Sequence, residues 1–142
     1  MDTAVKLLLD TNILVYGEDK KNPQKQILAI EFIDDCIKRN NGVLSIQNLV
    51  EFSNVLNTKI NLPSHDINER IKDFSTDFDL IHYNKDSILK ANEYCEKFRT
   101  DFFDALIIAT MEENGISIIA TENVDHFSFI PWLTVINPFK KK

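Results

Sequence analysis

Five short runs of hydrophobic residues predict β-strands along the chain. They cover residues 5–9, 42–45, 78–83, 116–120 and 133–136. The first and fourth runs, VKLLL and ISIIA, do not alternate hydrophobic with polar positions. Strands of a parallel sheet that are covered on both faces have this character, so these two runs predict central strands.

Segments between the strands carry hydrophobic residues at helical spacing and predict helices. The first of them has Pro23, which suits a first helical turn, and ends in Asn-Asn-Gly, a common stop signal. The third begins at Asp66 with Glu69 three residues later, which predicts a capping box. The last is hydrophobic on nearly every side, which predicts a deeply buried helix. The five segments cover residues 22–42, 45–60, 66–74, 84–99 and 100–115.

The order of these elements indicates the fold class. Strands that alternate with helices predict an α/β fold with a mostly parallel sheet and right-handed crossovers. A length of 142 residues suits a single domain that spans residues 1–142. In such sheets, ligands bind beyond the carboxyl ends of the strands, near the point where the strand order reverses. Asp10 and the sequence TEN at 121–123 each follow a predicted strand directly.

Composition and charge narrow the classes of function. Hydrophobic residues make up 44% of the chain and charged residues 27%, as in globular proteins. No apolar run approaches the roughly 20 residues of a membrane span, so we expect a cytoplasmic protein that does not bind membranes. A net charge of -6 argues against a protein that coats nucleic-acid phosphates with basic residues. An acidic chain can still act on nucleic acid when its carboxylates hold a metal ion, which reverses the local potential.

Two acidic residues, Asp10 and Glu51, lie directly beside hydrophobic segments that predict buried structure. Asp10 ends a buried strand, and its side chain either caps a following helix or enters a functional site. Glu51 lies at the edge of a hydrophobic stripe formed by Leu49, Phe52 and Leu56. Its side chain either reaches water or points into a pocket that it shares with other acids.

Asp104 carries the strongest single signal for a site. It lies in the first turn of the most hydrophobic predicted helix, on the same face as Ile107, Ile108 and Met111. One interpretation is that Asp101 caps this helix and Asp104 is its reciprocal partner. However, Asp101 already supplies a capping acid, and a buried charge without a partner is costly. Because no basic residue lies nearby on this helix, a metal ion would provide the compensation.

A polar cluster follows the fourth predicted strand, in the sequence ATENVDHF at 120–127. By itself it is also typical of a polar turn. Together with the three acids, it predicts a metal site at one edge of the sheet. Oxygen ligands without a His or Cys pattern favour Mg²⁺ or Mn²⁺ over Zn²⁺. Carboxylates that hold such ions support phosphodiester hydrolysis without a side-chain nucleophile.

Three stretches of the chain carry a resemblance to a known family. LLLDTNILVY, SIQNLVEFSNVL and FFDALIIATMEENGISIIATENVDHF, in this order, resemble the PIN-domain family, in particular its short VapC-like toxins. The resemblance implies a three-layer α/β/α sandwich with a central, mostly parallel sheet of about five strands. It also implies an Mg²⁺- or Mn²⁺-dependent ribonuclease. For toxin members it further implies a homodimer that is inhibited by an antitoxin encoded beside it.

Carried over position by position, the resemblance assigns roles to residues. Asp10, Glu51 and Asp104 match the three acids of the family pattern, and we expect them to hold the metal and to be catalytic. The fourth position, where many members have aspartate, falls on Asn123, which offers an oxygen ligand but no charge. The neighbouring Asp125 would supply the missing charge as a further metal ligand and catalytic carboxylate. This departure favours a site that holds one ion at rest.

The expected reaction is attack of water on an RNA phosphodiester. Asn12 and Thr121 would orient the acids through hydrogen bonds. Basic residues at the rim would contact the phosphates of the RNA, although each candidate is more often simply a solvated surface residue. The candidates are Lys20, Lys21, Lys97 and Arg99.

Two other classes of function stay open from the sequence. The neutral Asn123 leaves open a PIN-like domain that binds RNA or a protein partner without cutting. An aspartyl-phosphate protein, either a receiver or a phosphatase of the haloacid-dehalogenase type, would also place Asp10 and Thr121 after strands. The phosphatase pattern requires a second aspartate where Asn12 stands, and a receiver requires a lysine after the last strand, where LTVINPF has none.

Overall fold

A central parallel β-sheet organises the computed structural model, which describes residues 5–140. Its strands lie in the order β3-β2-β1-β4-β5, and every neighbouring pair is parallel. All five predicted strands are confirmed, and each lies within its predicted range. The strands are β1 (Leu7–Leu9), β2 (Gly42–Ser45), β3 (Asp79–Ile81), β4 (Ile118–Ala120) and β5 (Thr134–Ile136).

The helices confirm the five predicted segments and add one that was not predicted. The additional helix is α1 (Thr11–Tyr16), which follows β1 after a single residue. The predicted helix over 45–60 is α3 (Ile46–Val55), continued by a π-helical turn, η1 (Leu56–Ile60). The others are α2 (Pro23–Arg39), α4 (Ser64–Asp77), α5 (Lys85–Phe98) and α6 (Phe102–Glu113), with a 3₁₀ turn η2 (Val124–His126).

The predicted ends of α2 are confirmed, whereas the predicted start of α4 is wrong. Pro23 begins α2, and Asn40 ends it in the left-handed conformation, with φ of 52°. The capping box predicted at Asp66 is wrong. Helix α4 already begins at Ser64, after Pro63, so Asp66 lies within the first turn and no side chain caps the helix.

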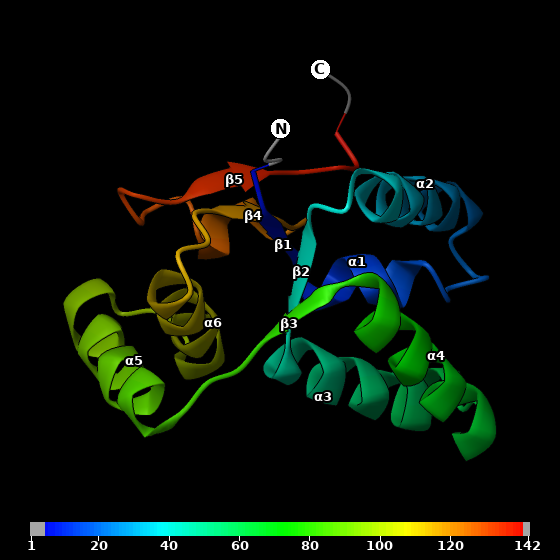
Figure 1. The fold of residues 1–142 in the computed structure, drawn as a ribbon, viewed down its shortest axis with the longest axis horizontal. Helices are drawn as coiled ribbons and strands as arrows, with labels where there is room; N and C mark the ends of the chain where they lie inside the picture. Colours follow the sequence, from blue (N-terminus) through cyan, green and yellow to red (C-terminus); the bar gives the residue numbers. More distant parts are fainter. Residues whose placement is uncertain (1–4, 141–142) are drawn as a thin grey trace.

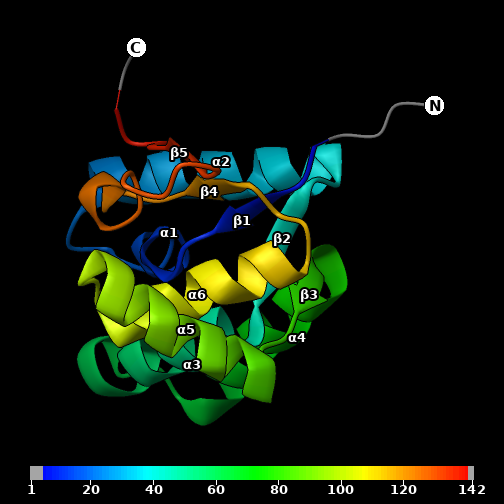
Figure 2. The same cartoon turned by 90° about the vertical axis from the view of Figure 1, so that its left-hand side faces the viewer.

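The sheet is covered on both faces, which confirms the predicted three-layer α/β/α sandwich (Figures 1 and 2). Helices α5 and α6 pack on one face, and α1 to α4 pack on the other. Leu8 and Leu9 are both fully buried but belong to different cores, because successive side chains of a strand point to opposite faces. Every residue of α6 from Ala105 to Met111 is buried, as its hydrophobic sequence predicts.

The connections place a crevice at the carboxyl end of the sheet. From β1 the chain passes to β2 and β3 on one side, and then returns to β4 and β5 on the other. The strand order therefore reverses between β1 and β4, and parallel sheets bind ligands at such a point. Asp10 follows β1, and Thr121 follows β4.

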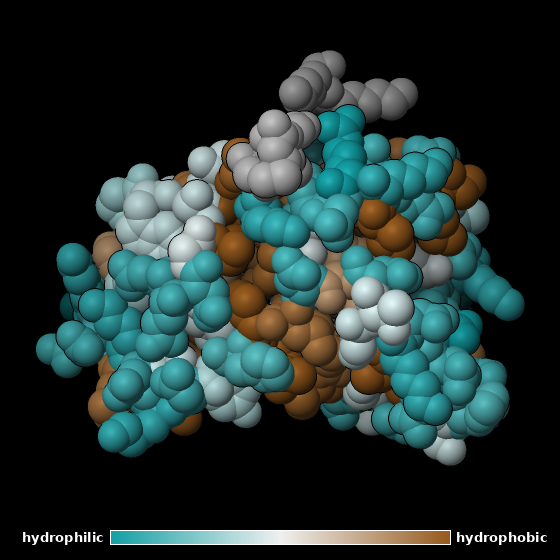
Figure 3. Space-filling view, in the orientation of Figure 1, coloured by the Kyte–Doolittle hydropathy of each residue, from teal (hydrophilic) through white to brown (hydrophobic). Residues whose placement is uncertain are grey.

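The surface is largely polar but not uniformly so. On the face seen in Figure 3, hydrophobic side chains reach the surface between two polar flanks. Val50, Tyr83 and Phe103 are among the exposed hydrophobic residues, and they line a hollow of about 370 Å³. Within residues 5–140, none of the helices combines the length and the apolar character that a membrane crossing requires.

Candidate active site

Asp10 is held at the end of β1 by three hydrogen-bond donors. The backbone N–H of Thr11 donates to its Oδ1 at 2.8 Å, so the side chain caps α1. The Thr121 hydroxyl donates to Oδ2 at 2.8 Å, and Asn12 Nδ2 lies 3.5 Å from the same oxygen. Burial nevertheless raises the pKa of Asp10 above its ordinary value. The Asp10 carboxylate therefore does both things that the sequence left open, because it caps α1 and also lines a cavity.

Glu51 reaches the same cavity from α3 and is bonded to the first residue of α1. The Thr11 hydroxyl donates to Glu51 Oε1 at 2.9 Å, and Gln47 Nε2 lies 3.5 Å from Oε2. The buried Asn48 donates in turn to the Thr11 hydroxyl at 3.0 Å. Burial raises the pKa of Glu51, and the negative charge of Asp10 adds to this effect. Glu51 thus points into the shared cavity instead of reaching away into water.

Asp104 enters the cavity from the first turn of α6. Asp101 caps this helix by accepting from the backbone N–H groups of Phe103 and Asp104, at 3.0 and 3.2 Å. The Asp104 side chain does not reciprocate but lies 3.1 Å from His126 Nδ1. Burial raises the pKa of Asp104 to about 6, and the negative charges of Asp10 and Asp101 act in the same direction. Local sequence does not predict a role for His126, because only the fold brings it close to α6.

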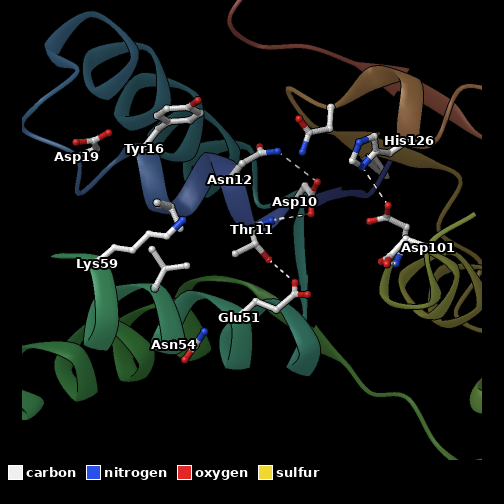
Figure 4. A pocket seen from close by; sticks show the side chains of 14 residues that line it. Asp10, Thr11, Asn12, Tyr16, Asp19, Glu51, Asn54, Lys59, Asp101 and His126 are labelled. Carbon is white, nitrogen blue, oxygen red and sulfur yellow. Dashed lines mark hydrogen bonds and ion pairs between the residues drawn. The ribbon is translucent and has the colours of Figure 1, made fainter. Parts of the chain in front are cut away.

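These residues surround one cavity of about 760 Å³, which we call the acid cavity (Figure 4). Five carboxylates line it against one lysine, so its net charge is -4 with His126 neutral. A cavity of this charge repels anions and attracts cations. The charged and polar residues around it are Asp10, Thr11, Asn12, Tyr16, Asp19, Glu51, Asn54, Lys59, Asp101, Asp104, Asn123 and His126.

The polar cluster after β4 is divided by the structure. Asn123 lines the acid cavity, and its backbone N–H donates to the Thr121 hydroxyl at 3.0 Å. Asp125 does not line the acid cavity but a neighbouring cavity of about 290 Å³, which Asn123 and His126 also line. The structure thus brings Asn123 to the three acids but does not bring Asp125 to them.

A separate network holds the turn that carries Asn123. The Tyr16 hydroxyl donates to Glu122 Oε1 at 2.6 Å, and Lys25 Nζ forms an ion pair with Glu122 Oε2. Lys25 also lies over the Tyr16 ring, 4.8 Å from its centroid. These contacts tie the turn after β4 to α1 and α2. Local sequence does not predict these contacts, because they join segments about 100 residues apart.

The donor set suits a hard divalent cation. Three carboxylates whose pKa values are all raised face one cavity, and within residues 5–140 no lysine or arginine is bonded to any of them. In the same part of the chain, no three acidic, His or Cys side chains lie close enough together to hold a metal ion by themselves. Mg²⁺ does not need such a group, because it keeps several waters and is usually held by one or two carboxylates. The residues therefore fit a partly hydrated ion.

One protein family and several solved structures are similar to this chain. The PIN-domain family model matches residues 7–131. No curated protein matches the sequence. Among solved structures, a chain of VapBC2 from Rickettsia felis, bound to a DNA fragment from its promoter, is similar, with a TM-score of 0.69 and 19% identity; the match covers 94% of this chain and 98% of that one.

Two further structures extend the likeness in fold. VapBC-1 from nontypeable Haemophilus influenzae gives a TM-score of 0.69 at 16% identity, covering 96% of this chain and 100% of that one. VapC20 from Mycobacterium tuberculosis, described as a toxin that cleaves the sarcin-ricin loop, gives 0.67 at 19% identity, with coverage of 90% and 97%. The TM-scores and the coverage show a shared fold across nearly the full length of each chain.

Proposed function

The chain belongs to the PIN-domain family, and from this premise we propose that it is a divalent-metal-dependent endoribonuclease that acts in the acid cavity. One observation carries the proposal. Asp10 follows β1, and Glu51 and Asp104 lie on α3 and α6, yet all three carboxylates line the same cavity with raised pKa values. Such uncompensated charge is costly for folding alone and is typical of functional sites. Family membership also argues against a receiver or a phosphatase.

Each side chain of the site has a role in the proposed reaction. PIN nucleases generally use divalent metal ions. Asp10, Glu51 and Asp104 would hold Mg²⁺ or Mn²⁺, with the amide oxygen of Asn123 beside them. When bound, such an ion lowers the pKa of water and stabilises charge on a phosphate. Asp125 is left out of this set because, unlike Asn123, it does not line the acid cavity.

Neighbouring groups would keep the carboxylates in position. The Thr121 hydroxyl and the Asn12 amide orient Asp10, while the Thr11 hydroxyl orients Glu51. His126 orients Asp104 through the contact of 3.1 Å. Groups that fix ligand orientation in this way typically change metal affinity or activity by about 10- to 100-fold when they are removed.

We further propose that the protein is the toxin of a toxin–antitoxin pair, acting on RNA in the cytoplasm. Support comes from similar structures, which include complexes described as VapBC and as a toxin–antitoxin complex. A homodimer is also proposed, and the exposed hollow at Val50, Tyr83 and Phe103 offers it an apolar surface. Light scattering should then give the mass of a dimer, and Phe103→Ser should lower it.

Cleavage of a mixed RNA pool tests the proposed activity. The wild-type protein should cut RNA with Mg²⁺ or Mn²⁺ and should stop cutting in EDTA. Asp10→Asn, Glu51→Gln and Asp104→Asn should each lower the rate by about 100-fold or more. Asp73→Asn, an exposed change on α4, is the matched control and should leave the rate unchanged.

Two results would refute the nuclease. Cutting that persists in EDTA or in the Asp104→Asn variant would show that the acid cavity is not its source. A folded wild-type protein that neither cuts RNA nor binds Mn²⁺, but still binds RNA, would favour the binding-only PIN-like domain instead.

A further inference from the structure

A second cavity continues directly from the acid cavity. Its volume is about 660 Å³, and it shares Val15, Asp19, Val55 and Lys59 with the acid cavity as lining residues. It lies between the segment after α1 and the segment that joins α3 to α4. We call it the basic cavity.

The basic cavity has the opposite charge to its neighbour. Lys20, Lys21, Lys59 and Arg70 line it against two acids, Glu18 and Asp19, so its net charge is +2. This local excess occurs on a chain whose net charge is -6, directly beside a cavity of -4. A polyanion would be repelled by the chain as a whole but attracted at this place.

The basic groups are available to a ligand. Lys20, Lys21 and Lys59 are exposed, and within residues 5–140 none of them forms an ion pair. Arg70 Nε lies 3.1 Å from Glu18 Oε1, which fixes its guanidinium at the wall. The lysines thus offer charges that no acidic group of the described chain neutralises by direct contact.

An irregular helical turn places Lys59 at the junction of the two cavities. Lys59 belongs to η1, the π-helical turn at the end of α3, which Asn61 ends in the left-handed conformation with φ of 60°. Figure 4 shows the Lys59 side chain extending from this segment towards α1, at the edge of the acid cavity. π-Helical turns cost regular hydrogen bonding and occur frequently at functional sites.

We infer that the basic cavity binds the phosphates of an unpaired RNA strand beside the bond that is cut in the acid cavity. This inference rests on the proposed function. The walls add Val15, Val55, Ile60 and Leu62, which are apolar. They would contact the sugar and base of an unpaired nucleotide, whereas a duplex keeps its bases stacked inside.

Only two of the four basic residues that the sequence predicts as phosphate contacts line the basic cavity. Lys20 and Lys21 line the basic cavity. Lys97 and Arg99 lie at the end of α5 and line neither of the two cavities. Lysines on α5 therefore provide controls of equal charge change.

Binding of RNA without cutting tests the inference. The probe is a short mixed-sequence single-stranded RNA, and the same RNA annealed to its complement, with Mg²⁺ present. The protein carries Asp104→Asn throughout, so that cleavage does not consume the probe. Lys20→Gln combined with Lys21→Gln is compared with Lys85→Gln combined with Lys97→Gln, both exposed pairs. Unchanged thermal unfolding confirms that each variant is folded.

The expected result is specific to the first pair. Loss of two phosphate contacts should weaken binding of the single strand by about tenfold and reduce the slope of log K against log salt concentration by about 1.4. Lys59→Gln should weaken it further. The inference is overturned if the α5 pair weakens binding equally, or if the duplex binds as tightly as the single strand. Wild-type protein that does not cut would refute the proposed nuclease but leave these binding differences intact, so the two failures are distinguishable.

Discussion

Replacing Asp104 with asparagine should stabilise the metal-free protein at neutral pH, although it should also impair the proposed cleavage. The carboxylate is partly buried, faces the negative charges of Asp10 and Asp101, and has a pKa raised to about 6 from its ordinary 3.8. A carboxylate whose pKa is higher in the folded state favours folding while it is protonated. This contribution is fully present below about pH 4 and is lost as the pH rises through 6.

The size of the effect follows from the pKa. A change from 3.8 to about 6 corresponds to about 3 kcal/mol, at 1.36 kcal/mol for each pH unit. The Asp104 side chain keeps 23% of its surface in water, and Asp104→Asn also gives up the contact with His126. We therefore expect a net gain of about 1 to 2 kcal/mol at pH 7.5, which is about 3 to 8 °C in Tm.

Thermal unfolding in EDTA, from pH 4.5 to 7.5, is the appropriate assay. The stability of the wild type relative to Asp104→Asn should fall across this range, and the two should be similar at its acidic end. Added Mg²⁺ should stabilise the wild type by mass action and leave Asp104→Asn nearly unchanged. Asp73→Asn should follow the wild type throughout. If Asp104→Asn is the less stable protein at pH 7.5 in EDTA, the carboxylate is a structural partner and the reasoning fails.

Three further substitutions test other parts of the structure. Thr11→Val removes the hydroxyl that holds Glu51, so cleavage should fall about tenfold while the fold is retained; an unchanged rate would remove Thr11 from the site. Asn123→Asp adds a charge to the acid cavity and should tighten Mn²⁺ binding by about tenfold in calorimetry. An unchanged affinity would show that this side chain does not face the ion. Gly42→Ala places a methyl group against the buried Phe78 ring and should lower the free energy of unfolding in urea by about 2 kcal/mol. An unchanged free energy of unfolding would show that the core around Phe78 is packed more loosely.

Most of the fold was predictable because its hydrophobic pattern is strong. Runs such as LLL before Asp10 and IIA before Thr121 are long enough to identify buried strands, and the parallel arrangement follows from the helices between them. The short helix α1 was missed, because Thr11–Tyr16 is too brief to show a helical period. The predicted start of α4 is wrong because Asp66 and Glu69 have the spacing of a capping box. The helix in fact begins two residues earlier, at Ser64, directly after Pro63.

The site was predictable only in its charged residues. Asp10, Glu51 and Asp104 stand out in sequence because each interrupts a hydrophobic environment. Their partners do not stand out. Thr11 and His126 become part of the site only through contacts between segments 40 residues apart and between η2 and α6. Asn123 likewise precedes the 3₁₀ turn η2, whereas Asp125 lies within it, and only Asn123 lines the acid cavity, a difference that local sequence does not specify.

Mn²⁺ binding measured by calorimetry tests the central claim, that three carboxylates from separate elements serve one divalent cation. The wild-type protein should bind the ion saturably. Asp10→Asn, Glu51→Gln and Asp104→Asn should each weaken binding by about tenfold or more, and Asp73→Asn should bind like the wild type. Binding that is absent from the folded wild type, or that survives all three substitutions, would contradict the account.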